Sequence, residues 1–138
     1  MAKKKVLFLC THNSCRSQMA EGIVNHFLSN RFQAFSAGTE ATSVNKRAIE
    51  TMLEIGIDIS GHRSKTMEEF AGEKLDYVIT LCGDANEKCP LFFGGVERMH
   101  LGFTDPSRAS GSEEDVRLEF RRVRDEIKAT LLEFFEDK

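Results

Sequence analysis

Tryptophan is absent from this sequence of 138 residues, tyrosine occurs once, and proline occurs only twice. No stretch rich in proline, glycine or serine divides the chain, and it contains neither an internal repeat nor a low-complexity tract. A chain of this length can bury roughly two-thirds of its unfolded surface in one core. We therefore expect a single domain that covers residues 1–138.

An excess of basic residues is also missing, because 19 Lys and Arg stand against 22 Asp and Glu and the net charge is −3. This balance argues against nucleic-acid binding, and an anionic substrate must then be attracted by local groups. The apolar run Val6–Leu9 is too short for a membrane span or for the core of a signal peptide. We expect a cytoplasmic protein that acts as a monomer, with neither nucleic acid nor a membrane as a partner.

What the sequence does contain is an alternation of strand and helix patterns. Continuous apolar runs predict buried strands, and apolar residues at spacings of three and four predict amphipathic helices. The expected strands are residues 6–10, 34–37, 75–81 and 98–101, and the expected helices are residues 16–28, 45–53, 66–69 and 112–134. This order predicts an α/β fold in which a four-stranded parallel sheet is flanked by helices on both faces.

Polar residues mark the start of three of these helices. Asn45 is expected to cap the second helix, because its side chain can accept from unpaired N–H groups. Thr66 with Glu69 has the spacing of a capping box. Ser112 with Asp115 opens the last helix, whose first turn is acidic.

Three residues with reactive side chains follow the ends of expected strands. Cys10 ends the first strand, Cys82 follows the third, and Asp105 lies in the loop after the fourth. Ligands of open parallel sheets bind at the carboxyl ends of the strands. We therefore expect these three side chains to lie together, although they are far apart in the sequence.

The residues between the first strand and the first helix have the composition of an anion-binding loop. A tight loop that runs into a helix N-terminus directs its backbone N–H groups at one point, and the helix dipole adds positive potential. Arg16 adds parallel donors for a tetrahedral oxyanion, and the same surroundings favour the thiolate of Cys10. Ser17 is placed to donate a hydrogen bond to that sulfur, and Asn13 tolerates a left-handed backbone. The expected oxyanion-binding residues are Thr11, His12, Asn13, Ser14, Cys15, Arg16 and Ser17.

The four cysteines, Cys10, Cys15, Cys82 and Cys89, allow other interpretations. Without an export signal a static disulfide framework is not expected, which leaves redox catalysis or metal binding. A zinc site usually has two closely spaced pairs of ligands, and these spacings are wider, so no metal site is expected. Cys10 could also be a buried thiol at a strand end, with Arg16 as a surface charge, and we expect Cys15 to be a bystander.

Segment 10–17, together with Ser36-Ala37-Gly38, resembles the low-molecular-weight phosphotyrosine phosphatases. The resemblance covers essentially the whole chain. Segments 10–21 and 80–90 are similar to the thioredoxin-coupled arsenate reductases of that fold. The resemblance implies arsenate as substrate, with phosphate or sulfate as mimics, and thioredoxin as the reducing partner.

The same resemblance implies a role for each of five residues. Cys10 would attack arsenate, Arg16 would bind it, and Asp105 would protonate the departing oxygen. Cys82 would then attack Cys10 and release arsenite, and Cys89 would attack Cys82 and regenerate Cys10. Each of the later steps is a thiol–disulfide exchange.

Cys82 and Cys89 are seven residues apart, which sets a geometric condition on that relay. If the segment were helical, their Cα atoms would be about 10.5 Å apart. A disulfide needs roughly 4.4 to 6.8 Å. Formation of a bond between them therefore requires the segment to unwind or loop out.

The residues after Asp105 argue against a tyrosine phosphatase. Phosphatases of this fold often follow the acid with tyrosines, whereas here the sequence continues Ser107-Arg108-Ala109, and the single tyrosine, Tyr77, lies in an expected strand. Two alternatives to a reductase stay open. One is a low-molecular-weight phosphatase that hydrolyses a Cys10 phosphoenzyme, and the other is a non-catalytic oxyanion or redox sensor.

Some arsenate reductases of this type hold a potassium ion, through positions that match Asn13, Glu21, Ser36 and an aspartate. Lys65 stands where that aspartate would fall. We expect no cofactor, because the potassium ion is in doubt and the Lys65 ammonium could take its place.

Overall fold

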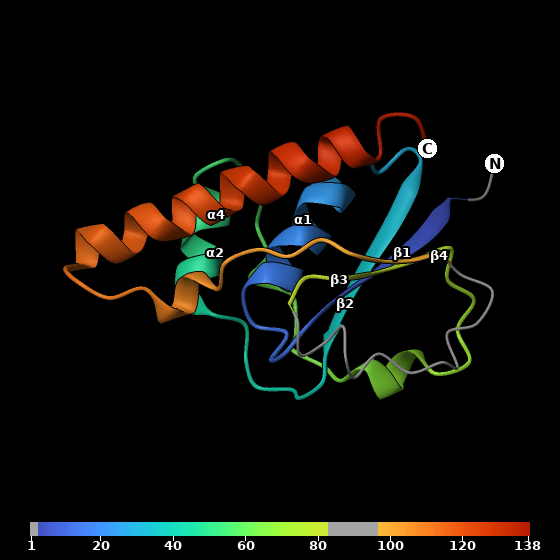
Figure 1. Cartoon of the computed structure of the whole chain (residues 1–138), viewed down its shortest axis with the longest axis horizontal. Coiled ribbons are helices and arrows are strands. Elements are labelled where there is room, and N and C mark those ends of the chain that lie inside the picture. The colour runs from blue at the N-terminus through green and yellow to red at the C-terminus, as the bar shows by residue number, and fades with distance from the viewer. Residues whose placement is uncertain (1–2, 83–96) are drawn as a thin grey trace.

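Residues 3–82 and 97–138 are described in the computed structural model, and they form a single parallel sheet with helices packed on it (Figure 1). The strands are β1 (Lys4–Cys10), β2 (Phe32–Gly38), β3 (Tyr77–Thr80) and β4 (Glu97–His100). Their order across the sheet is β2-β1-β3-β4, and every neighbouring pair is parallel. The predicted four-stranded parallel sheet is confirmed.

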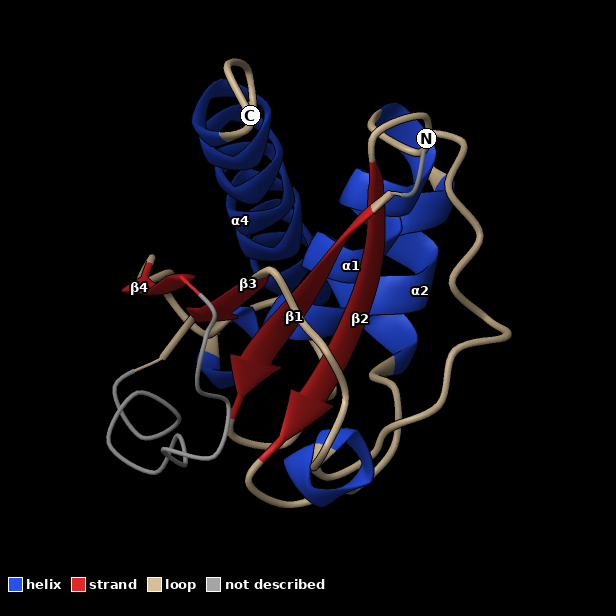
Figure 2. Ribbon diagram, turned by 90° about the vertical axis from the view of Figure 1, so that its right-hand side faces the viewer, coloured by secondary structure: helices blue, strands red, loops and turns tan. Residues whose placement is uncertain are grey.

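Three α-helices cover one face of this sheet (Figure 2). They are α1 (Arg16–Phe27), α2 (Lys46–Leu53) and α4 (Glu113–Phe134). Among the described residues, the opposite face is covered by the 3-10 helix η1 (Met67–Phe70) and its flanking loops. A second 3-10 helix, η3 (Pro106–Arg108), lies between β4 and α4. None of the described helices is long and apolar enough to cross a membrane.

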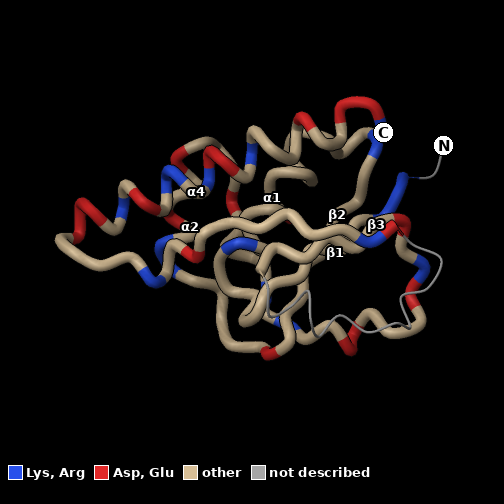
Figure 3. Tube along the Cα trace, viewed as in Figure 1, with Lys and Arg blue, Asp and Glu red and all other residues tan. Residues whose placement is uncertain are grey.

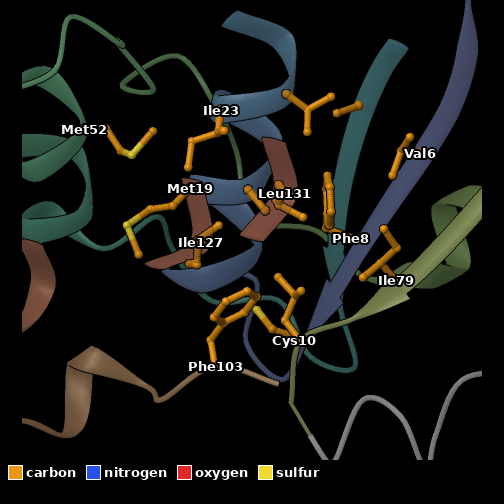
Figure 4. Close-up of a cluster of buried hydrophobic side chains, with 14 of the residues drawn as sticks. Val6, Phe8, Cys10, Met19, Ile23, Met52, Ile79, Phe103, Ile127 and Leu131 are labelled. Atoms are coloured by element: carbon orange, nitrogen blue, oxygen red, sulfur yellow. The ribbon is translucent and has the colours of Figure 1, made fainter. Parts of the chain in front are cut away.

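β1 is the central strand, and its side chains alternate between two buried clusters. Val6, Phe8 and Cys10 face the three α-helices, whereas Leu7 and Leu9 face η1. The larger cluster lies between the sheet and the helices, and Cys10 is found at one end of it (Figure 4). The strand that carries Cys10 is therefore held by hydrogen bonds on both edges and by side chains on both faces.

All three predicted helix starts agree with the structure, but only two of the three predicted caps form. The Asn45 side chain accepts from N–H groups in the first turn of α2, and Ser112 and Asp115 form a reciprocal capping box at the start of α4. The capping box predicted for Thr66 and Glu69 is wrong, because the Thr66 side chain makes no cap hydrogen bond. The Glu69 carboxylate instead pairs with both terminal nitrogens of Arg63, at 2.9 and 2.6 Å. A bidentate charged partner competes successfully with a single backbone N–H.

Candidate active site

The Cys10 thiol lies at the end of β1 and contacts the Ser17 hydroxyl. The two atoms, Sγ and Oγ, are 2.8 Å apart. The Ser17 oxygen also accepts a hydrogen bond from Nδ2 of Asn13, at 2.8 Å. Because the amide of Asn13 is the donor in that contact, the hydroxyl proton of Ser17 is left to point at the sulfur. The contact between the Ser17 hydroxyl and the Cys10 sulfur that the sequence predicts is therefore present.

Asn13 adopts the left-handed conformation expected for it, with φ of 50°, and it is fully buried. Its Oδ1 accepts from the backbone N–H of Lys65 at 2.9 Å and from the Gln18 side chain at 3.0 Å. One side chain therefore ties the loop to the first turn of α1 and to the segment before η1. The cost of its backbone conformation is offset by these hydrogen bonds.

The loop is anchored from one side through its carbonyl oxygens, each of which accepts a hydrogen bond from the protein. The donors are the N–H of Thr39 to Cys10 O (3.3 Å), the N–H of Glu40 to Thr11 O (3.0 Å), the hydroxyl of Ser64 to His12 O (2.9 Å), the amide of Gln18 to Asn13 O (3.1 Å) and the N–H of Asn45 to Ser14 O (2.9 Å). In a trans peptide the N–H points away from its C=O. Anchoring the carbonyls therefore turns the N–H groups toward the other side, where an oxyanion would bind.

Gly38 explains how this loop can lie so close to β2. It pairs with Cys10 across the sheet. A Cβ at Gly38 would be 2.7 Å from the carbonyl oxygen of Thr11 and 2.8 Å from the backbone nitrogen of Asn13. Only glycine permits this approach, which accounts for its position in the Ser36-Ala37-Gly38 motif.

Arg16 begins α1, and its guanidinium contacts the loop after β4. It donates to the carbonyl oxygen of Phe103 at 3.2 Å, and it lies 3.5 Å from Oδ2 of Asp105. The N-terminus of α1 has neither a side-chain cap nor an acidic residue in its first turn. Its unpaired N–H groups and the guanidinium therefore offer positive potential at the same end of the helix.

Cys82 is brought to the loop by Thr11. The Thr11 hydroxyl and the Cys82 sulfur are 3.2 Å apart, and Cys82 is half-buried. Cys10 and Cys15 are free thiols. With the contact of Arg16 to Asp105, the expected meeting of three distant segments at the carboxyl ends of the strands is confirmed. Cys89 lies outside the described residues.

The other loop residues differ in their surroundings. The His12 ring is half exposed and lies 3.3 Å from the Glu40 carboxylate. Cys15 is buried, and burial raises the pKa of its thiol to about 12, with the nearby Asp105 and Cys10 acting in the same direction. The Ser14 hydroxyl, 3.8 Å from that sulfur, acts in the opposite direction. A thiol held neutral in this way is a poor nucleophile, which agrees with the expected bystander role.

Below the loop, Glu21 is surrounded by donors. Its Oε1 accepts from the Ser36 hydroxyl at 2.6 Å and lies 3.8 Å from Nζ of Lys65, while Oε2 lies 3.3 Å from Nε2 of His62. Burial lowers the pKa of Lys65, and the Glu21 carboxylate acts in the opposite direction. The Lys65 ammonium thus lies beside the Glu21 carboxylate. In the described part of the chain, no group of three or more His, Cys, Asp or Glu side chains could hold a metal ion.

Two residues of the site were not identified from the sequence. The Gln18 side chain joins the loop to the carbonyl of Arg63 at 3.1 Å and to the His62 ring at 2.9 Å. A buried glutamine inside an apolar helix pattern is a signal that could have been used. Ser107 donates to Asp105 through both its N–H and its hydroxyl, at 3.0 and 2.7 Å. In the sequence, the only sign of this contact is that Ser107 follows Asp105 by two residues, the spacing of a turn closed by an aspartate side chain.

Comparison with known proteins finds a matching family model and similar sequences over nearly the whole chain. The sequence model described as "Low molecular weight phosphotyrosine protein phosphatase" matches residues 5–137. A curated protein of Shouchella clausii named "Arsenate reductase" is 49% identical over 136 residues, which are 99% of this chain and 98% of the relative. A protein of Bacillus subtilis with the same name is 48% identical over 136 residues, which are again 99% of this chain and 98% of the relative.

Solved structures give the same result. The chain superposes on a structure described as "An arsenate reductase in the phosphate binding state" with a TM-score of 0.82, at 36% identity and 95% coverage of both chains. A low molecular weight protein tyrosine phosphatase from T. tengcongensis superposes with a TM-score of 0.78, at 25% identity, over 99% of this chain and 100% of that one.

Proposed function

Because this chain belongs to the low molecular weight phosphotyrosine protein phosphatase family, we propose that it uses the loop of that family to bind arsenate and reduces it to arsenite. The observation that carries this proposal is the contact of Cys82 with Thr11, which puts a second thiol beside the loop that holds Cys10. Hydrolysis of a phosphoenzyme needs no second thiol. The relatives of about 48% identity that are named arsenate reductases support the same choice.

In the first step the Cys10 thiolate attacks the arsenic of arsenate. A sulfur–arsenic bond forms and the bond from arsenic to one hydroxyl group breaks, and that hydroxyl takes a proton from Asp105 and leaves as water. Arg16 and the loop N–H groups bind the remaining oxygens. The 3.5 Å contact between Arg16 and Asp105 supports these roles, because it brings the acid to the group that would hold the anion.

In the second step the Cys82 thiolate attacks the sulfur of Cys10. A disulfide forms, the sulfur–arsenic bond breaks, and its electron pair stays on arsenic, which leaves as arsenite. Thr11 supports this step, because a hydroxyl at 3.2 Å can donate to the attacking thiolate. Cys89 then attacks Cys82 and releases Cys10 as a thiolate. Thioredoxin, a dithiol partner, reduces the Cys82–Cys89 disulfide and closes the cycle.

The relay is tested by arsenate-dependent consumption of NADPH in the presence of thioredoxin and its reductase. We expect turnover in the wild type, and a loss of at least about a hundredfold in Cys82→Ser and Cys89→Ser, because each removes an obligatory nucleophile. Cys15→Ser is the matched control and is expected to keep turnover within about threefold, since the Cys15 thiol stays neutral.

Full turnover in either relay variant would remove the three-cysteine mechanism. A wild type that ignores arsenate but cleaves phenyl phosphate would identify a phosphatase. A protein that binds oxyanions and transforms neither compound would be a sensor.

We also propose that the Lys65 ammonium replaces the potassium ion of related reductases. Nζ of Lys65 lies 3.8 Å from Oε1 of Glu21, so the ammonium already neutralises the carboxylate that a potassium ion would need. Turnover in sodium and in potassium buffers of equal ionic strength is expected to be equal for the wild type. Lys65→Asp should make turnover depend on potassium. Strong activation of the wild type by potassium would contradict the proposal.

A further inference from the structure

The two oxygens of the Asp105 carboxyl group have different surroundings. Oδ1 accepts two hydrogen bonds from Ser107, from its N–H at 3.0 Å and from its hydroxyl at 2.7 Å. Oδ2 lies 3.5 Å from the Arg16 guanidinium and 3.8 Å from Nε of Arg108. Only Oδ2 therefore lies on the side of Arg16 and the anion loop.

This asymmetry determines which oxygen can carry a proton. A carboxyl group has one acidic proton, and an oxygen that already accepts two hydrogen bonds is the poorer place for it, because both donors would then face an O–H group. A proton taken up by Asp105 therefore resides on Oδ2. That is the oxygen on the side of Arg16, the group that would hold the substrate in the proposed function.

We propose that Ser107 is a positioning residue that keeps Oδ1 occupied and presents the protonated Oδ2 of Asp105 to the leaving oxygen. The inference rests on the proposed role of Asp105 as the acid. Ser107 itself does not touch the substrate. It prevents rotation of the carboxyl group, which would exchange the two oxygens and point the proton away from the reaction.

The hydroxyl contact is separate from the turn that begins η3. Asp105 precedes η3, and its bond to the Ser107 N–H is the usual cap of such a turn. That bond survives when the hydroxyl is removed. Ser107 is exposed and Pro106 fixes the backbone before it, so Ser107→Ala is expected to fold normally.

The test measures arsenite release in a single turnover, at saturating arsenate and without any reductant, so that thioredoxin has no part in it. Ser107→Ala is expected to lower the rate constant about three- to tenfold and to leave the arsenate concentration at half-saturation unchanged. Ser107→Thr keeps a hydroxyl and should recover most of the rate. Ser110→Ala, an exposed serine of the same loop, is the matched control and should equal the wild type.

A double-mutant cycle separates positioning from a general structural effect. In Asp105→Asn no acidic proton remains to be placed, so adding Ser107→Ala should slow the reaction no further. Equal losses in both backgrounds, a raised half-saturation concentration, or no loss in Ser107→Ala alone would each overturn the inference. If Asp105→Asn alone has the full rate, Asp105 is not the acid, and the inference about Ser107 fails with the proposed function. If Asp105→Asn is slow but Ser107→Ala is not, only the inference about Ser107 fails.

Discussion

At the scale of single residues, the site gives two neighbouring thiols opposite chemical characters. Both sulfurs are buried, but the Cys10 sulfur contacts the Ser17 hydroxyl at 2.8 Å, whereas the Cys15 sulfur has only the Ser14 hydroxyl at 3.8 Å. The difference comes from the local donors, because both cysteines belong to the same loop. Residue type alone does not specify which thiol reacts.

This difference predicts selective alkylation. At pH 8 and under native conditions, iodoacetamide is expected to modify Cys10 faster than Cys15, because both sulfurs are buried but burial raises the pKa of the Cys15 thiol to about 12. Peptide mapping by mass spectrometry after timed quenching measures the rate of modification at each of the two cysteines. In urea Cys15 should become reactive. Equal rates at both cysteines in the folded protein would contradict the assignment.

At the scale of elements, hydrophobic periodicity was enough to predict the strands and helices, and their order was enough to predict the parallel sheet. The meeting of Cys10, Cys82 and Asp105 followed from topology. The capping box at Thr66 failed because Glu69 has a stronger partner in Arg63, and no local pattern reveals that competition. Contacts with the distant residues His62 and Arg63 fix the role of Gln18, which is why the local sequence does not show it. Ser107 contacts its near neighbour Asp105, and a serine two residues after an aspartate is too common in turns to identify a site residue.

Gly38 gives a test at this scale. Gly38→Ala would put a methyl group 2.7–2.8 Å from the backbone of the loop, so β2 and the loop must separate. We expect the free energy of unfolding to fall by about 1–3 kcal/mol and phosphate binding to weaken at least about tenfold. Urea unfolding and titration calorimetry measure the two effects. The control is Gly61→Ala, where a Cβ meets no atom within 4 Å.

At the scale of the whole molecule, the long helix α4 carries charges of both signs that alternate along its length (Figure 3). A group of ion pairs joins α2 to α4. Glu54, just after α2, contacts Arg121 at 2.7 Å and Arg124 at 2.9 Å, and Arg124 also donates to the carbonyl of Thr51 at 3.0 Å. These contacts fix the end of α2 against the long helix.

The Glu54 contacts predict a pH dependence of stability. Hydrogen bonds from Arg121, and then from Arg124, lower the pKa of Glu54, so its contribution is present above the unfolded value of about 4.3 and is lost as the pH falls through the lower folded value. Glu54→Gln should therefore be less stable than the wild type at pH 7, by about 1 kcal/mol, and the difference should shrink toward pH 3. Urea unfolding at both pH values measures this. A difference that does not change with pH would show that lost packing, and not charge, is responsible.

The anchoring of the loop carbonyls also limits how the site could be transplanted into another protein. The donors that the structure gives to these carbonyls lie in segment 39–45, at Ser64 and in the first turn of α1, and so outside the loop itself. A design that copies only residues 10–17 onto a foreign strand and helix would therefore leave those peptide units free to turn over. A functional transfer has to carry the two flanking segments along with the loop, together with the glycine that lets them come close.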